Sequence, residues 1–199
     1  MTDLQQFLRA AAFAARKHQH QRRKDPDASP YINHPLTVAA LLAEEGGVTD
    51  PITLTAAVLH DTLEDTATTP EELAAAFGPA VRDVVQELTD DKRLPKAERK
   101  RRQVMAAAHL SDRAKRIRIA DKIVNVHDVT HHPPAHWNLQ RRQDYLEWTA
   151  TVVAGCRGVN LRLEAVYDQA LQEGRTILGV SVTSYTRTIR FSRQAGQGR

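Results

Sequence analysis

The chain has 199 residues, 41% of them hydrophobic and 26% charged, which is typical of one globular domain and short for two. Its net charge of +4 and its pI near 9.4 indicate an anionic partner, either nucleic acid or a phosphorylated metabolite. A single cysteine, Cys156, excludes an intrachain disulfide, and no secretory leader or membrane-length apolar run is evident, so we expect a cytoplasmic protein without membrane partners.

Helix start and stop signals recur along the chain, while patterns typical of strands are almost absent. Asp3 and Gln6 have the spacing of a capping box that would open the first helix. Asp50 and Thr69 each stand directly before a proline, and Ser111 precedes a long apolar pattern, so all three are expected helix caps. The expected helices cover residues 3–18, 35–45, 51–65, 70–77, 79–88, a short stretch from 95, 112–129, 138–154 and 160–173.

These elements predict an all-α fold, a single helical bundle of about eight or more helices within residues 1–179. Residues 180–199 have four arginines, no acidic residue and little core pattern. We expect them to form a basic C-terminal tail that is either disordered or used by a partner.

The stretch LTAAVLHDTLED (residues 54–65) ends an otherwise apolar helix in four ionisable residues. His60 and Asp61 are adjacent, and Glu64 and Asp65 repeat this pairing one turn later, so the two pairs would stack along one continuous helix. Burying such groups without partners is costly, and a divalent metal ion is the simplest partner. The sequence therefore predicts a metal site whose remaining ligands come from other segments.

Two residues are candidates for those ligands. His34 lies at the start of the expected second helix, and Asp121 lies among apolar residues of a long helix, where a carboxylate needs a partner. With His60 and Asp61 they form a mixed nitrogen and oxygen set that suits Mn²⁺, Fe²⁺, Zn²⁺ or Mg²⁺. Taken singly, each residue is more often a helix cap or an ion-pair partner, so the joint pattern carries the prediction. A denser histidine group lies in a proline-rich loop without periodicity and is expected to be solvated or peripheral: His131, His132 and His136.

The order of these residues resembles a known family. His34, the His60–Asp61 pair and Asp121 follow the H…HD…D pattern of the HD phosphohydrolase superfamily. The segments RRKDPDASPYINHP, AAVLHDTLEDT, ELTDDKRLPKAERKRRQ and ADKIVNV resemble the hydrolase domain of the Rel/SpoT alarmone enzymes. They are most similar to the stand-alone small alarmone hydrolases, the group that includes the metazoan SpoT homologue. The resemblance covers residues 4–178, and its motifs are specific in combination.

The resemblance implies a role for each matching residue. The implied ligands of one metal ion, Mn²⁺ in this family, are His34, His60, Asp61 and Asp121. The implied catalytic residues, which position or activate the attacking water, are Glu64 and Asp65. The implied contacts to the nucleotide are Arg23, Lys24, Asn125, Tyr145, Arg141 and Lys96.

The activity that the resemblance implies is hydrolysis of the 3′-pyrophosphate of ppGpp or pppGpp, which yields GDP or GTP and pyrophosphate. We expect no synthetase or regulatory region in a chain of this length. Two alternatives stay open: removal of the 2′-phosphate of NADPH in the same pocket, and alarmone sensing without turnover. A nucleic-acid partner is not expected, because the basic run ERKRR at residues 98–102 has no interleaved aromatic residues. The oligomeric state is open, a homodimer included.

Overall fold

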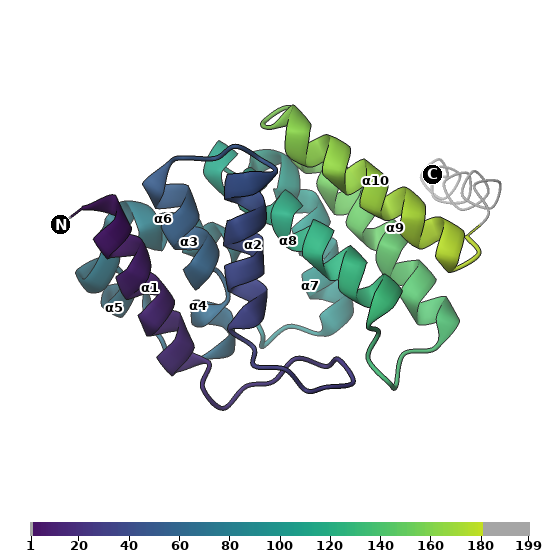
Figure 1. Cartoon of the computed structure of the whole chain (residues 1–199), viewed down its shortest axis with the longest axis horizontal. Helices are drawn as coiled ribbons and strands as arrows, with labels where there is room; N and C mark the ends of the chain where they lie inside the picture. The colour runs from purple at the N-terminus through teal and green to yellow at the C-terminus, as the bar shows by residue number, and fades with distance from the viewer. Residues whose placement is uncertain (1, 181–199) are drawn as a thin grey trace, which may run out of the picture.

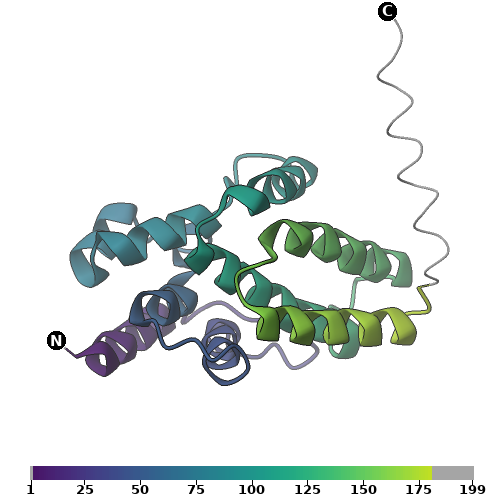
Figure 2. The same ribbon diagram turned by 90° about the horizontal axis from the view of Figure 1, so that it is seen from above.

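Helices account for all the regular structure that the computed structural model describes, which covers residues 2–180 (Figures 1 and 2). Within this range the β-structure is an isolated bridge between Arg22 and Pro30. The helices are α1 (Asp3–Lys17), α2 (Asn33–Glu44), α3 (Pro51–Leu59), α4 (Thr62–Asp65), α5 (Pro70–Phe77), α6 (Pro79–Leu88), α7 (Lys96–Ala106), the 3₁₀ turn η1 (Ala107–His109), α8 (Asp112–His131), α9 (Leu139–Cys156) and α10 (Leu161–Ile177). The predicted all-α bundle of eight or more helices is therefore confirmed.

The predicted tail falls almost wholly on residues 181–199, which lie outside the described residues. The expected division of the chain at residue 179 therefore stays a prediction. Between residues 2 and 180, no helix is both long and apolar enough to cross a membrane.

Side-chain caps set most of the helix starts. The side chains of Asp50, Thr69 and Ser111 each accept a hydrogen bond from a backbone N–H group in the first turn of α3, α5 and α8. These three predicted caps depend only on neighbouring residues. The helix starts at residues 51, 70 and 112 accordingly fall where the sequence predicts them.

The first helix is capped one residue earlier than the sequence analysis indicates. Thr2 and Gln5 form a reciprocal capping box, with Gln5 N to Thr2 Oγ1 at 3.2 Å and Thr2 N to Gln5 Oε1 at 2.9 Å. The expected Asp3–Gln6 box is therefore wrong. Asp3 instead occupies the first turn of α1, where a negative charge favours the helix dipole.

The expected continuous helix over residues 51–65 is also wrong. Helix α3 ends at Leu59, and α4 begins at Thr62. The hydroxyl of Thr62 donates to the Leu59 carbonyl at 2.7 Å, and the backbone of Asp61 has φ −96° and ψ −3°. Neighbouring side chains on a regular helix diverge by about 100°. The break lets His60 and Asp61 turn toward the same point.

Helix α8 is the central element of the bundle. It packs against α2, α3, α6, α9 and α10, and Figure 2 shows it between the N-terminal helices and the α9–α10 pair. Its buried face is apolar over most of its length but also contains three charged residues: Arg118, Asp121 and Lys122. Arg118 Nη2 donates to the Leu88 carbonyl at 3.0 Å, which ties α8 to the end of α6. The other two belong to the candidate site.

Two leucines of α10 offer a matched test of core packing. Leu163 is fully buried, whereas Leu161 on the same helix is 79% exposed. We expect Leu163→Ala to lower the free energy of unfolding by about 2–5 kcal/mol, because it leaves a cavity beside the end of α2. Leu161→Ala should change it by less than about 0.5 kcal/mol. Urea denaturation measures both values, and equal effects of the two substitutions would contradict this packing.

Candidate active site

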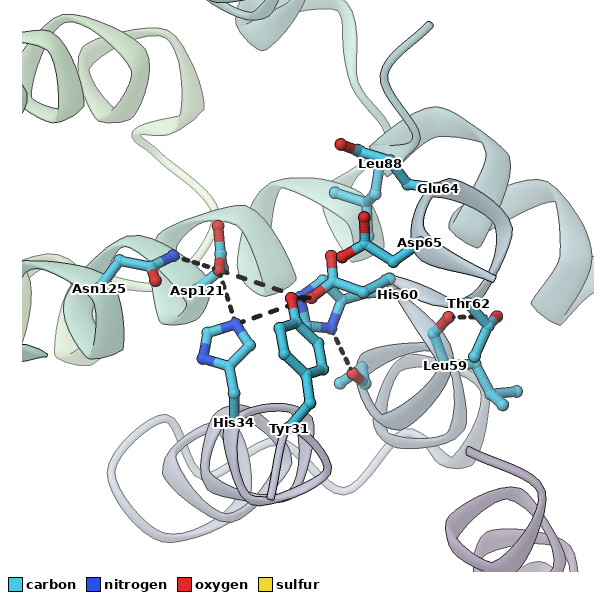
Figure 3. Close-up of polar contacts among 12 residues, drawn as sticks. Tyr31, His34, Leu59, His60, Thr62, Glu64, Asp65, Leu88, Asp121 and Asn125 are labelled. Atoms are coloured by element: carbon cyan, nitrogen blue, oxygen red, sulfur yellow. Dashed lines mark hydrogen bonds and ion pairs between the residues drawn. The ribbon is translucent and has the colours of Figure 1, made fainter. Parts of the chain in front are cut away.

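A cluster of buried ionisable side chains joins α2, the α3–α4 break and α8 (Figure 3). One ligand atom from each of His34, His60 and Asp121 lies within 4.8 Å of the other two. His34 Nε2 is 3.1 Å from Asp121 Oδ1, and His60 Nε2 is 3.9 Å from the same oxygen. Asp61 Oδ2 is 3.1 Å from His60 Nε2 and 3.9 Å from His34 Nε2. The structure thus brings all four predicted metal ligands together.

The donor atoms of this cluster fit a small divalent ion. Atoms that share one metal ion at about 2.0–2.2 Å lie about 3 to 4 Å apart, as these do. His60 Nδ1 bonds to the Ala57 carbonyl at 2.7 Å, so in the neutral ring the proton is on Nδ1 and Nε2 carries the lone pair that a metal ion needs. That Nε2 is buried and faces the carboxylate oxygens of Asp61 and Asp121 at 3.1 and 3.9 Å, without the alignment of a hydrogen bond to either. A buried imidazole nitrogen that points at two carboxylates is suited to share a divalent ion with them.

The electrostatics of the cluster also favour a cation. Burial opposes the charged form of His60, yet the carboxylates of Asp61 and Asp121 raise its pKa to about 9. Burial likewise opposes the charged form of Asp121, but Lys122 and the two histidines hold its pKa well below the usual range. Lys122 Nζ is 2.9 Å from Asp121 Oδ2. The carboxylates of Asp121 and Asp61, one buried and one partly buried, therefore create a negative potential that favours a bound cation.

Tyr31 supports one of the predicted ligands. Its hydroxyl donates to Asp61 Oδ2 at 2.7 Å, and burial together with the nearby carboxylates of Asp61 and Asp65 raises its pKa. Its ring lies 4.9 Å from the His18 ring and beneath the Arg23 guanidinium at 5.6 Å. Tyr31 therefore orients Asp61, and its ring contacts Arg23, one of the residues predicted to bind the nucleotide.

The two predicted catalytic acids lie in different surroundings on α4. Glu64 accepts from the backbone N–H of Asp90 at 3.1 Å and from Arg99 at 3.4 Å. Burial raises the pKa of Glu64 to about 7, and the negative charges of Asp90, Asp61 and Asp65 add to this. Asp65 forms an ion pair with Lys92.

A cavity of about 530 Å³ lies beside the cluster. Its wall includes Tyr31 and Asn125, which hydrogen-bond to the cluster residues Asp61 and Asp121. Asp65 lines it, whereas Glu64 does not. Basic side chains outnumber acidic ones on its wall, five to three: Arg22, Arg23, Lys24, Lys92 and Lys96 against Asp25, Asp65 and Asp128. A cavity with this balance suits a ligand with several negative charges.

Five of the six predicted nucleotide contacts line this cavity: Arg23, Lys24, Lys96, Asn125 and Tyr145. The sixth, Arg141, is not on the wall but stacks on Trp137, which is, at 4.4 Å from the guanidinium carbon to the ring centre. Lys96 lies over the same ring at 5.5 Å. Burial and the nearby Arg141, Lys24 and Arg99 lower the pKa of Lys96, so this end of the cavity concentrates positive charge.

Several residues of the site were not predicted from the sequence. Tyr31 lies in the same YINHP segment as His34, and Lys122 is adjacent to Asp121, so proximity in sequence to a ligand was the signal available for both. Trp137 follows the proline-rich loop and has no local signal. Asp128, which forms an ion pair with Arg23, lies one helical turn beyond Asn125 on α8. Its spacing from Asp121 could have indicated it.

Comparison with known families identifies the class of protein. Residues 10–147 match the model of the HD domain. The chain therefore belongs to the HD-domain family, whose members are all-helical and hold a divalent metal ion. The resemblance inferred from the sequence is confirmed at this level.

Known relatives narrow the class further. The chain is 51% identical over 172 residues to the guanosine-3′,5′-bis(diphosphate) 3′-pyrophosphohydrolase MESH1 of Xenopus tropicalis, covering 86% of this chain and 96% of that protein. It is 52% identical over 173 residues to human MESH1, covering 86% and 97%. A solved structure of a metazoan ortholog of SpoT, described as hydrolysing ppGpp and acting in starvation responses, superposes with a TM-score of 0.82 at 43% identity, covering 84% of this chain and 94% of that one.

Loss of the Tyr31 hydroxyl tests its support of the metal cluster. We expect Tyr31→Phe to weaken Mn²⁺ binding by about 10- to 100-fold, because an unsupported Asp61 is a poorer ligand. Titration followed by the electron paramagnetic resonance of free Mn²⁺ gives the affinity. Tyr167→Phe is the matched control, since it removes another buried hydroxyl bond, 2.9 Å to Thr149, away from the cluster. Unchanged Mn²⁺ affinity in Tyr31→Phe would contradict the supporting role.

Proposed function

We propose that this chain is a metal-dependent guanosine-3′,5′-bis(diphosphate) 3′-pyrophosphohydrolase, which converts ppGpp or pppGpp to GDP or GTP and pyrophosphate. The observation that carries the proposal is the buried His34–His60–Asp121 cluster beside a cavity on whose wall basic side chains outnumber acidic ones. Relatives with this activity in their names match nearly their whole length to this chain, at about half identity.

The metal of this proposal is Mn²⁺, held by His34, His60, Asp61 and Asp121. A set of two imidazoles and two carboxylates accepts Mn²⁺ and also other divalent ions. When bound, the ion neutralises phosphoryl charge and lowers the pKa of a coordinated water molecule. Tyr31 and Lys122 keep the two carboxylates in place for it.

Glu64 and Asp65 divide the remaining chemistry in this proposal. Glu64 has a pKa near 7, so it can accept a proton at neutral pH and pass it on. Its bonds to Asp90 N and Arg99 hold the carboxylate in one orientation. Asp65 lines the cavity, where its ion pair with Lys92 places a cation next to the acid.

The nucleotide would lie in the cavity, with its phosphates toward the cations. Arg23 and Lys24 lie on the loop before α2, while Lys96 and Arg141 approach from α7 and α9 around Trp137. Guanidinium and ammonium groups bind phosphate oxygens through charge-assisted hydrogen bonds. Asn125 is the proposed contact to the guanosine, as the resemblance implies, and Tyr145 is a further proposed contact to the nucleotide, since both line the cavity.

Nucleic acid is not part of this proposal. On α7, Glu98 pairs with both Arg101 and Arg102, at 2.8 and 2.9 Å, so part of the basic run is neutralised locally. A cytoplasmic location stays a prediction, and a homodimer stays one of the open oligomeric states.

Product analysis tests the proposed reaction. We expect the metal-stripped protein to be inactive and added Mn²⁺ to restore release of pyrophosphate from ppGpp, with GDP as the other product. Anion-exchange chromatography identifies the products. With NADPH as the substrate, the same protein should release phosphate more slowly than it releases pyrophosphate from ppGpp. Phosphate release from NADPH without pyrophosphate release from ppGpp would replace the proposal with the phosphatase alternative, and tight ppGpp binding without turnover would indicate a sensing module.

The pH profile tests the role of Glu64. The base form of a carboxyl group is the carboxylate, so kcat/KM should rise with pH through about 7, the pKa of Glu64, and level off above it. Glu64→Gln should lower kcat by about 100- to 10,000-fold and remove this rise. Glu45→Gln, at an exposed position after α2, should retain both the rate and the profile. A profile that persists in Glu64→Gln would assign the titration to another group.

A further inference from the structure

Three histidines gather at the C-terminal end of α8, outside the candidate active site. His131 lies four positions after His127, so both are on the same face of the helix, and their ring centres are 4.6 Å apart. His132 follows as the C-cap residue, with its ring 6.1 Å from His127 and 6.5 Å from His131. All three are exposed, as the sequence indicated for His131 and His132, yet they are grouped rather than dispersed.

Negative charge surrounds this group. His131 Nε2 is 3.2 Å from Glu173 Oε1 on α10, and His127 Nδ1 is 3.8 Å from Asp128 Oδ1. The group also lies at the carbonyl end of a 20-residue helix, which attracts cations. Two positive groups also lie close by: Arg142 donates to the carbonyls of Val129 and Thr130, and Arg23 pairs with Asp128.

We propose that His127, His131 and His132 form a second metal site, separate from the buried cluster, for a transition-metal ion of the Zn²⁺, Ni²⁺ or Cu²⁺ class. Two histidines four residues apart on a helix can bind one such ion from the same face. Imidazole nitrogen suits these ions, whereas Mn²⁺ and Mg²⁺ prefer sites richer in oxygen. Glu173 or a water molecule completes the coordination.

In the structure, the ring nitrogens of the three histidines do not lie close enough together to share one ion. Among residues 2–180, only the buried cluster brings three ligand atoms within 4.8 Å of one another. Closing the histidine site therefore requires rotation of exposed side chains. Such a rotation costs side-chain entropy but no loss of core packing, because 59% of the His127 side chain and 31% of the His131 side chain are exposed.

The second site lies at the rim of the candidate active site. His132 lines the cavity of about 530 Å³, and His127 lines a neighbouring cavity of about 410 Å³. Asp128 lines both cavities and pairs with Arg23. An ion bound to the histidines would therefore add positive charge to the rim of the active site. Binding of this ion does not require the proposed hydrolase activity.

Metal counting on the untagged full chain, saturated with Mn²⁺, tests the proposal with Ni²⁺ as the probe. Equilibrium dialysis followed by elemental analysis measures both metals. The wild type should bind one more Ni²⁺ per chain than the double variant His127→Gln/His131→Gln. The affinity of the double variant for this additional ion should be lower by more than about tenfold. Any exchange of Mn²⁺ for Ni²⁺ at the buried cluster affects both proteins equally. His136→Gln, which alters an exposed histidine in the loop after α8, is the control and should bind as the wild type does. Equal binding by the wild type and the double variant overturns the proposal.

A second measurement uses the unaltered protein and so does not depend on the folding of a variant. Substoichiometric Ni²⁺ is paramagnetic and should broaden the imidazole proton resonances of His127, His131 and His132 before those of His136. Uniform broadening of all exposed histidines would overturn the proposal. Neither measurement uses ppGpp, so its result is independent of the proposed reaction.

Discussion

The buried carboxylate of Asp121 is the constraint on which the rest of the structure depends. It is 7% exposed in the middle of α8, where an uncompensated charge would be costly. His34 from α2 at 3.1 Å, Lys122 at 2.9 Å and Asn125 at 2.6 Å compensate it. Removing one partner of a buried ion pair typically costs about 3–5 kcal/mol. The packing of α2 against α8 is therefore tied to the electrostatics of the site, and a metal ion at the cluster would strengthen the same contact.

Polar residues continue from Asp121 along a single face of α8. Arg118, Asp121, Asn125, Asp128 and His132 follow one another at alternating spacings of three and four residues, which align on a helix. The stripe begins in the core, where Arg118 bonds to the Leu88 carbonyl, and ends at the rim of the cavity. One rigid helix thus fixes the distance between the metal cluster and the wall that would hold the nucleotide. This is the precision that positioning of a reacting phosphate requires.

The sequence was informative where structure depends on neighbouring residues. The caps at Asp50, Thr69 and Ser111 follow from local hydrogen bonds. Asp121 could be inferred as a ligand because a carboxylate in an apolar helix needs a partner, and His34 because it stands at a helix start in the same overall pattern. The break after Leu59 could not be predicted, because a threonine hydroxyl bonding to a carbonyl also occurs within regular helices. Trp137 was missed for a different reason. It lies in the loop after α8, and it contacts Lys96 of α7 and Arg141 of α9. The hydrophobic periodicity of the sequence carries no information about contacts between such distant segments.

The placement of charge separates the two kinds of anionic partner that a pI near 9.4 allows. Extended nucleic acid requires a continuous basic surface, and on α7 that surface is interrupted by the pairs of Glu98 with its arginines. Two lysines of α7 instead lie over aromatic rings: Lys96, on the cavity wall, over Trp137 at 5.5 Å, and Lys100 over Trp148 at 4.5 Å. Burial lowers the pKa of both lysines, so bringing a phosphate to them relieves an electrostatic cost. Positive charge that is confined, partly buried and backed by aromatic rings favours a small, highly phosphorylated nucleotide over a polymer.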